Sequence, residues 1–260
     1  MNGEWSAPIT WVGRSALGAA SRFGDYGRFL GHVGRATLDT ATWGRVLLVQ
    51  LGRVGVASLP IALFIAAFTG IVLALQASYT FTGAVPLYFV GVLVGKTMLL
   101  ELGPVLTGLA LAGRVGANIA AELGTMRVTE QIDALETLAY NPVSYLVVPR
   151  IIAGVLMFPI VVAFADAMGI FAGWLTAINL LDLSTPEFVR GLRMYFVTFD
   201  VTYSLIKAAS FGFAVTSIGC FFGFTTRGGA EAVGRSTTQS VVLASMLILV
   251  LDAFWAVTLL

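Results

Sequence analysis

Four charged side chains lie within otherwise apolar stretches of this sequence: Lys96, Glu101, Asp166 and Asp252. A charge at the centre of a bilayer costs about 2.5–3.5 kcal/mol on insertion scales, so each should face a bundle interior, a wet cavity or a partner. Lys96 and Glu101 are five residues apart, about 140° around an α-helix, and are not expected to pair with each other. An acid in this setting is typical of the lining of a polar cavity.

Pro104 bears on the environment of Glu101. It has no N–H to donate and is expected to loosen the helix at the turn that holds Glu101. A bent helix with an acid midway along it would line a polar cavity. The alternative is that the acid is buried and satisfied by neighbouring hydroxyl groups or by Lys207. The same alternative applies to Asp166 and Asp252, and both interpretations stay open on the sequence alone.

Catalytic motifs are poorly represented. Gly91, Gly95, Lys96 and Thr97 resemble a phosphate loop, but three residues separate the two glycines where that motif needs four, and the stretch is apolar. His32 is the single histidine, which excludes a His-based metal cluster and a Ser–His dyad within the apolar stretches. We therefore predict a non-enzymatic chain with no catalytic residue, metal site or cofactor of its own.

The elements that carry these residues are predicted to be membrane-spanning helices. The chain is 58% hydrophobic and 11% charged with a mean hydropathy of +0.90, and residues 54–95 contain no Asp, Glu, Lys or Arg. Soluble domains are roughly 25% charged. Apolar runs joined across single charges predict five spans, at about 55–78, 88–112, 150–178, 203–226 and 237–260. The expected fold is an all-α polytopic membrane protein, with a transmembrane domain over 54–260 and a cytoplasmic or interfacial segment over 1–53.

Arginine positions predict the orientation. With the N-terminus inside, the cytoplasmic segments hold Arg14, Arg22, Arg28, Arg35, Arg45, Arg53, Arg114, Arg127, Arg150, Arg227 and Arg235. The outer loops hold only Arg190 and Arg193. Positive residues are enriched in cytoplasmic loops, so the N-terminus should be cytoplasmic and, with five spans, the C-terminus should be on the outer side. The net charge of +1 gives no indication of nucleic-acid binding.

An amphipathic helix is predicted before the first span. Aromatic and aliphatic residues recur at helical spacing at Phe23, Tyr26, Phe29, Leu30 and Val33. Arginines lie off this stripe at Arg22, Arg28 and Arg35. A helix lying in the inner headgroup layer would bury the aromatic residues and let the arginines reach lipid phosphates. The alternative is a helix packed on the protein itself.

The long polar stretch between the second and third spans is also helical in pattern. Apolar residues recur between Ile119 and Leu138 with acidic residues on the remaining faces, and Asn141-Pro142 ends the run. We predict one or two amphipathic helices facing the cytoplasm, centred on about 122–139. Such a helix could merely pack beneath the bundle, or it could dock into a groove of a soluble partner.

Several short motifs in the sequence resemble those of a known family. The motifs are Glu101-Leu-Gly-Pro104, Ala112-Gly-Arg-Val-Gly116, Ala121-Glu-Leu-Gly124, Met126-Arg127, Thr129-Glu-Gln131 and Asn141-Pro142, with Leu75-Gln76, Pro149-Arg150 and Leu251-Asp252 outside this block. They closely resemble the MlaE-type permeases (MlaE/YrbE family), membrane subunits of Mce-associated ABC transporters that move lipids. The likeness covers roughly residues 50–260.

The resemblance implies an assembly. The family forms homodimers in the bacterial inner membrane whose first and fifth spans enclose a lipid cavity open to the periplasm. A cytoplasmic ATPase pair binds the ATP and docks on the helix at about 122–139. A periplasmic Mce-domain partner stands above the cavity, and a small STAS-like protein often joins the ATPase. The implied function is movement of phospholipid or a related lipid, as in maintenance of outer-membrane asymmetry.

The resemblance also implies site residues. Lipid-binding positions fall on Leu73, Ala77, Thr80, Phe81, Lys96 and Glu101. ATPase-coupling positions fall on Glu122, Leu123, Met126, Arg127, Glu130 and Asp133. Where the family commonly has a basic residue directly before the acid, this chain has Leu100, with Lys96 one turn earlier. The rival hypothesis is an ion-coupled secondary carrier or channel that would use Glu101, Asp166 and Asp252 as a path.

Overall fold

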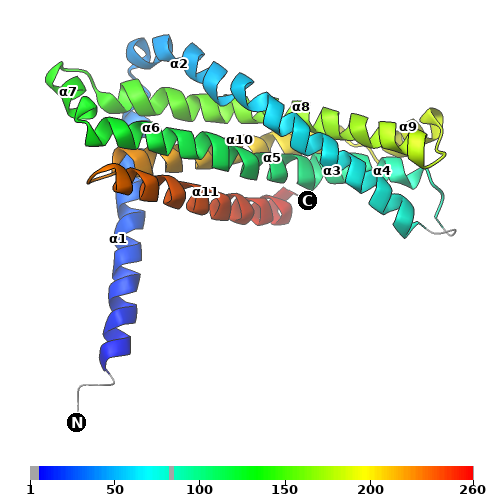
Figure 1. The fold of residues 1–260 in the computed structure, drawn as a ribbon, viewed down its shortest axis with the longest axis horizontal. Helices are drawn as coiled ribbons and strands as arrows, with labels where there is room; N and C mark the ends of the chain where they lie inside the picture. The colour runs from blue at the N-terminus through cyan, green and yellow to red at the C-terminus, as the bar shows by residue number, and fades with distance from the viewer. Residues whose placement is uncertain (1–5, 82–84, 260) are drawn as a thin grey trace.

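A computed structural model of the chain describes residues 6–81 and 85–259, with side chains described from Ser21 onward. Every regular element within these ranges is helical, and the long helices run along one elongated bundle (Figure 1). Helices satisfy all their backbone hydrogen bonds internally, which is the condition for crossing lipid. The apolar sequence and the architecture are therefore consistent.

Five helical segments in the described part of the chain are long and apolar enough to cross a membrane. They are Thr40–Thr80, Phe89–Val128, Val143–Leu180, Thr198–Phe224 and Ala230–Leu259. This confirms the predicted fold class, an all-α polytopic membrane protein. Each helical segment extends several residues beyond the predicted span at one end or both, because the helices continue into polar sequence at the ends of the bundle.

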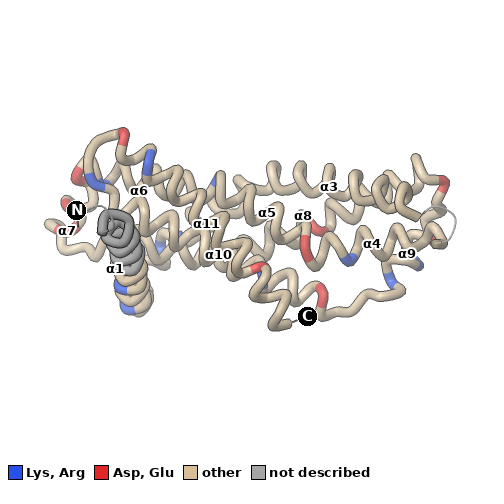
Figure 2. The backbone as a smooth tube through the Cα atoms, turned by 90° about the horizontal axis from the view of Figure 1, so that it is seen from below, with Lys and Arg blue, Asp and Glu red and all other residues tan. Residues whose placement is uncertain are grey.

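Several of these segments are composite. They consist of α2 (Thr40–Val54) and α3 (Leu59–Thr80), of α4 (Phe89–Thr97), α5 (Gly103–Leu111) and α6 (Ala117–Val128), of α8 (Val148–Leu180), of α10 (Thr198–Phe224) and of α11 (Ala230–Leu259). Turns of π-helix join α4 to α5 at Met98–Leu102 and α5 to α6 at Ala112–Gly116, and a third precedes α8 at Val143–Val147. α8 and α10 form the buried centre, whereas α3 and α11 are largely exposed. Charged residues gather toward the two ends of the bundle, with a small group between them (Figure 2).

Glycines allow the central helices to touch backbone to backbone. A Cβ atom added at Gly70 of α3 would lie 1.9 Å from the carbonyl oxygen of Gly169 in α8. One added at Gly212 of α10 would lie 2.3 Å from the carbonyl oxygen of Gly154 in α8. Small residues that permit such close approach are the usual means of association between membrane helices.

The end of the bundle opposite α7 (Gln131–Thr137) carries a short amphipathic helix, α9 (Thr185–Met194), between the third and fourth spans (Figure 1). Ser184 caps it: the Ser184 backbone N–H and hydroxyl both donate to Glu187, at 3.0 and 2.6 Å. These hydrogen bonds lower the pKa of the Glu187 carboxyl from its ordinary value. α9 lies against α4, where a Cβ atom at Gly191 would meet the carbonyl oxygen of Tyr88 at 1.9 Å.

The first helix, α1 (Ser6–Ala36), runs across the bundle rather than along it (Figure 1). Its later turns pack on the protein: the Tyr26 hydroxyl lies 2.7 Å from Ser217 Oγ, and the rings of Phe29 and Phe221 are 5.6 Å apart. Phe23, from the same predicted stripe, is 74% exposed. Part of the stripe therefore contacts α10, as in the second interpretation of the sequence. The crosswise direction also suits a helix lying in a membrane plane, and that interfacial placement stays a prediction.

The segment predicted at about 122–139 is divided between two helices. Its first part belongs to α6, which continues from the second span, and its second part is α7 (Gln131–Thr137). The break falls at Glu130, whose φ of 60° lies in the left-handed region. The predicted amphipathic segment is thus a bent pair of helices at the end of the bundle.

Gly70→Ala tests the close approach of α3 and α8. The added methyl group would meet the backbone of Gly169, and we expect the free energy of unfolding to fall by about 1–3 kcal/mol. Gly113→Ala is the matched control, because nothing lies within 4 Å of a Cβ atom there. Thermal unfolding in detergent measures both variants. Equal melting temperatures would contradict the proposed contact.

Candidate functional site

A buried ion network lies at the middle of the bundle and is centred on Lys207 of α10. The Lys207 side chain is fully buried, and its ammonium group forms ion pairs with Glu101, at 3.2 Å, and with Asp252 of α11. It also donates to the carbonyl oxygen of Leu100 at 2.8 Å. One ammonium group therefore ties the second, fourth and fifth spans together.

The bend beside Glu101 follows from Pro104. In an unbroken α-helix the carbonyl oxygen of Leu100 would accept from the N–H of residue 104, and proline has none. Residues Met98–Leu102 form a π-helical turn at this point. The ammonium group of Lys207 donates to the free carbonyl instead. The predicted loosening of the helix is confirmed, and its orphaned acceptor is part of the ion network.

The other acids are satisfied in different ways. The Ser204 hydroxyl donates to Asp166 Oδ2 at 2.8 Å, while Oδ1 of the same carboxyl group is buried without a hydrogen-bond partner. Lys96 pairs with Asp200 at 2.7 Å. It does not pair with Glu101, and the helical spacing had predicted that these two side chains would stay apart. The alternative of an acid paired with Lys207 thus holds for Asp252, whereas Asp166 is satisfied by a hydroxyl at one of its two oxygens. Glu101 is paired too, yet its side chain is 41% exposed, so it faces open space as well.

The predicted lipid-binding residues of the first span do not all face one way. Leu73 and Ala77 are buried, on the side of α3 that also carries Gly70 and packs on α8. This corrects their expected position on an open surface. Thr80 is exposed and Phe81 is partly buried at the end of the helix.

The opposite side of α3 is exposed and apolar, with one amide. Its exposed residues are Phe64, Phe68, Val72, Leu75, Gln76 and Tyr79. α5 contacts both α3 and α11, so it lies between them. The exposed large apolar residues of α11 are Val242, Leu243, Met246, Leu249, Val250, Phe254 and Val257. We call this surface of α3, α5 and α11 the open face. Gln76 is the amide among the exposed residues of α3, and a polar residue within the charge-free stretch was the sequence signal for it.

Two residues predicted to couple to an ATPase make contacts between helices of the bundle. Glu122 binds Arg53 of α2 at 3.2 Å and Arg150 of α8 at 3.1 Å. Leu123 is 0% exposed and abuts Gly223 of α10. Leu123 therefore does not lie on the cytoplasmic surface, because α6 continues from the second span and buries this side against α10.

The remaining predicted residues lie at the bend between α6 and α7. Arg127 and Asp133 form an ion pair of 2.5 Å across it, Met126 is half-buried and Glu130 is exposed. Two large apolar residues next to them are also exposed: Leu138 at 68% and Tyr140 at 54%. We call Met126, Arg127, Glu130, Asp133, Leu138 and Tyr140 the end patch. Its last two members were not among the predicted residues, although Leu138 belongs to the apolar pattern of the segment.

No group of three or more His, Cys, Asp and Glu side chains suited to a metal ion occurs among residues 6–81 and 85–259. The ionisable residues are instead paired across helices. The arrangement therefore provides a central clamp, an apolar surface and an exposed end patch.

Lys207→Met tests the clamp. Removing the ammonium group leaves Glu101 and Asp252 without a counter-charge, and breaking a buried pair costs about 3–5 kcal/mol. We expect a lower melting temperature in detergent and a loss of monodisperse protein. The triple variant Lys207→Met/Glu101→Gln/Asp252→Asn should recover much of the stability, because no charge is then stranded. A single variant as stable as the parent would contradict the clamp.

Comparison with known proteins agrees with this architecture. The family model described as Permease MlaE matches residues 47–258. A probable ABC transporter permease protein of Rickettsia felis is 38% identical over 239 residues, 92% of each chain. The intermembrane phospholipid transport system permease protein MlaE of Haemophilus influenzae is 35% identical over 208 residues, 80% of each chain.

A plant protein is similar as well. The chloroplastic protein TRIGALACTOSYLDIACYLGLYCEROL 1 of Arabidopsis thaliana is 34% identical over 208 residues, which is 80% of this chain and 59% of that one. The family model's match, residues 47–258, includes all five candidate spans except the first residues of α2 and the last residue of α11. The chain belongs to the MlaE permease family.

Proposed function

We propose that this chain is the permease subunit of an ABC transporter that moves phospholipid, or a related lipid, between the inner membrane and a periplasmic Mce-domain partner. The observation that carries the proposal is the open face, where α3 and α11 leave large apolar side chains uncovered around one amide. The similarity to a relative named for intermembrane phospholipid transport supports the cargo class. The chain itself performs no bond-breaking step in this proposal.

Two copies of the chain would enclose the cargo. The open faces of a homodimer, brought together, would form an apolar chamber for acyl chains, with Gln76, Thr80 and Glu101 offering polar contacts to a headgroup. Phe81 and the Lys96–Asp200 pair lie toward the outer end, where a periplasmic partner would receive the lipid. Leu73 and Ala77 support this wall from behind, because they hold α3 on its neighbours.

ATP would be bound by a separate cytoplasmic chain that docks on the end patch. Leu138 and Tyr140 supply apolar anchors, and Glu130 and Asp133 supply charge around them. Glu122 and Leu123 would transmit the movement, since they join α6 to α2, α8 and α10. Closure of the ATPase pair would then change the shape of the chamber and its affinity for lipid. A small STAS-like protein on the ATPase belongs to the same proposal.

Orientation completes the proposal. The end patch and the arginine-rich ends of the spans would face the cytoplasm, with the N-terminus, and α9 and the C-terminus would face the periplasm. This arrangement gives the ATPase the end patch and leaves the outer end of the chamber to the Mce-domain partner.

Tyr140→Arg tests the docking surface. A charged side chain in place of an apolar anchor should reduce co-purification with the ATPase by tenfold or more, since buried anchors contribute about 2 kcal/mol or more at an interface. Leu38→Arg is the control, because Leu38 is also a large exposed apolar residue, at 84% against 54% for Tyr140, but lies between α1 and α2. Affinity capture in mild detergent, with quantitative mass spectrometry, gives the readout. Undiminished capture of the ATPase by Tyr140→Arg would refute this docking site.

Gln76→Leu tests the chamber. Loss of the single amide on the exposed side of α3 should lower ATP-dependent transfer of fluorescent phospholipid in proteoliposomes by roughly tenfold, which corresponds to ~1.4 kcal/mol. Val72→Leu, one turn away, is the apolar control. ATPase activity should persist in both variants. Transfer that continues without ATP and requires an ion gradient would instead support the ion-coupled carrier.

A further inference from the structure

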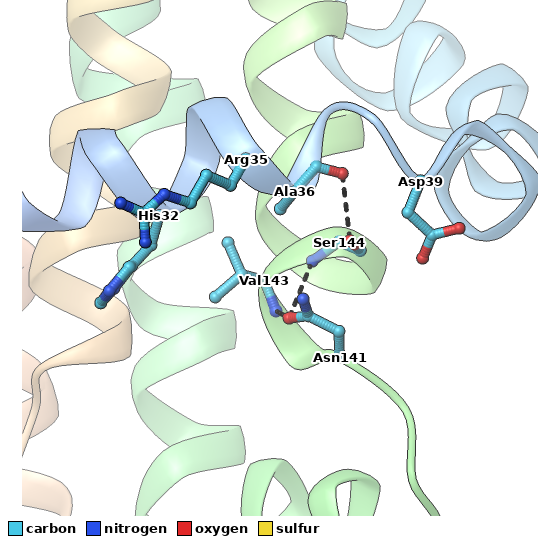
Figure 3. Close-up of a pocket in the computed structure, with 7 residues that line it drawn as sticks. All are labelled: His32, Arg35, Ala36, Asp39, Asn141, Val143 and Ser144. Carbon is cyan, nitrogen blue, oxygen red and sulfur yellow. Dashed lines mark hydrogen bonds between the residues drawn. The ribbon is translucent and has the colours of Figure 1, made fainter.

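A pocket unrelated to the open face lies where α1 meets the beginning of the third span. Its volume is about 420 Å³. The last turn of α1 and the turn before α2 form one side, and residues 141–144 form the other (Figure 3). The elements that meet here are far apart in the sequence, so the pocket exists only in the folded chain.

The wall of the pocket is fixed by its own hydrogen bonds. The Ser144 hydroxyl donates to the carbonyl oxygen of Ala36 at 3.1 Å, which ties the third span to the end of α1. The side-chain oxygen of Asn141 accepts from the backbone N–H groups of Val143, at 3.0 Å, and Ser144, at 3.4 Å. These hydrogen bonds pair the polar groups of Ala36, Asn141, Val143 and Ser144 with one another. They do not involve the charged side chains that line the pocket.

Three charged or ionisable side chains line the pocket: His32, Arg35 and Asp39. None of the three side chains has a hydrogen bond or ion pair within the described part of the chain. Figure 3 shows Arg35 beside His32 at one end and the carboxylate of Asp39 at the other, with Ser144 and Asn141 between. Asp39 precedes the first residue of α2, a position that favours a negative side chain. The pocket is therefore bipolar.

The depth of the pocket corresponds to lipid headgroups. Arg53, Glu122 and Arg150 form an ion-paired layer at the inner limit of the apolar segments. Ser144 lies six residues before Arg150, toward the polar end of the bundle. Because part of this stretch is the π-helical turn Val143–Val147, the separation along the axis is less than the roughly 9 Å of six α-helical residues. The headgroup region on each side of a bilayer is roughly 5–8 Å thick. α1 crosses the bundle at this level, as a helix in the membrane plane would (Figure 1).

The pattern of charge selects among headgroups. A guanidinium group binds a phosphate oxygen strongly, and a carboxylate binds an ammonium group by charge-assisted hydrogen bonds. A purely anionic headgroup or free phosphate would satisfy Arg35 but would be repelled by Asp39. A quaternary ammonium group is usually held by aromatic rings, and the residues lining this pocket include no Phe, Tyr or Trp. A primary amine joined to a phosphodiester fits both ends.

We propose that this pocket binds the headgroup of a zwitterionic phospholipid with a primary amine, of the ethanolamine type. Arg35 and His32 hold the phosphate, and Asp39 holds the ammonium group. The lipid comes from the inner leaflet and stays in place, so that it fastens α1 to both the membrane and the third span. This site lies outside the chamber proposed above and takes a lipid as a fixed ligand rather than as cargo.

The test uses the full chain in detergent, without ATPase, and measures retained lipid by native mass spectrometry. The probes are ethanolamine, choline and glycerol phospholipids with matched acyl chains, and inorganic phosphate. We expect retention of the ethanolamine lipid at least tenfold above that of the choline lipid. Arg35→Gln should lower the retention of both lipids, because both carry the phosphate. Asp39→Asn should abolish the preference for the ethanolamine lipid and shift it toward the anionic glycerol lipid, because the repulsion is gone.

Two controls separate this site from other effects. Arg28→Gln alters an exposed arginine of α1 that pairs with Asp25 and does not line the pocket, so it should keep the preference. The pocket variants are also assayed for ATP-dependent transfer of phospholipid in proteoliposomes, which makes failure here distinguishable from failure of the transport proposal. Equal retention of ethanolamine and choline lipids, undiminished retention in Arg35→Gln, or an unchanged preference in Asp39→Asn would overturn the proposal. So would displacement of the lipid by inorganic phosphate alone, which would identify a simple anion site.

Discussion

Satisfying polar groups without water is the constraint on which this structure depends. In the middle of the bundle the carbonyl of Leu100 has lost its usual donor, and two carboxylates lie within reach of one another. The ammonium group of Lys207 donates a hydrogen bond to this carbonyl and forms ion pairs with both carboxylates. Because it does so from the fourth span, the second and fifth spans must lie beside α10 at this level. The register of the central helices therefore follows from a local shortage of hydrogen-bond donors.

Charge pairs and close glycine contacts hold the helices together at different levels of the bundle. Near the ends of the apolar segments, Glu122 joins α6 to both α2 and α8. In between, Gly70 and Gly154 let α8 touch α3 and α10 directly. Because lipid offers no hydrophobic driving force between helices, such contacts and hydrogen bonds must supply the association. The outer sides of α3 and α11 take no part in it, which leaves them free for a further surface.

The sequence predicted the features that depend on charge and on apolar length. Five spans, the loosened turn before Pro104, and the separation of Lys96 from Glu101 all followed from composition and helical spacing. The direction in which Leu73 and Ala77 face did not, because α3 is apolar on every side and carries no periodic signal. Leu123 was misplaced for a related reason: the helix of the second span continues past its apolar part and buries residues that a surface helix would expose. The pocket beside α1 depends on contacts between distant segments.

The π-helical turns have a consequence for how one helix serves several neighbours. Each holds one residue more than an α-helical turn, so the helix beyond it is rotated relative to an uninterrupted one. Gly91 and Gly95, before the first such turn, face α9, whereas Gly108 and Gly116, after it, face α10. The glycine-bearing side of the second span therefore faces α9 before this turn and α10 after it. A deletion of one residue within Met98–Leu102 would preserve composition and hydropathy, yet would turn the inner half of this span away from its neighbour.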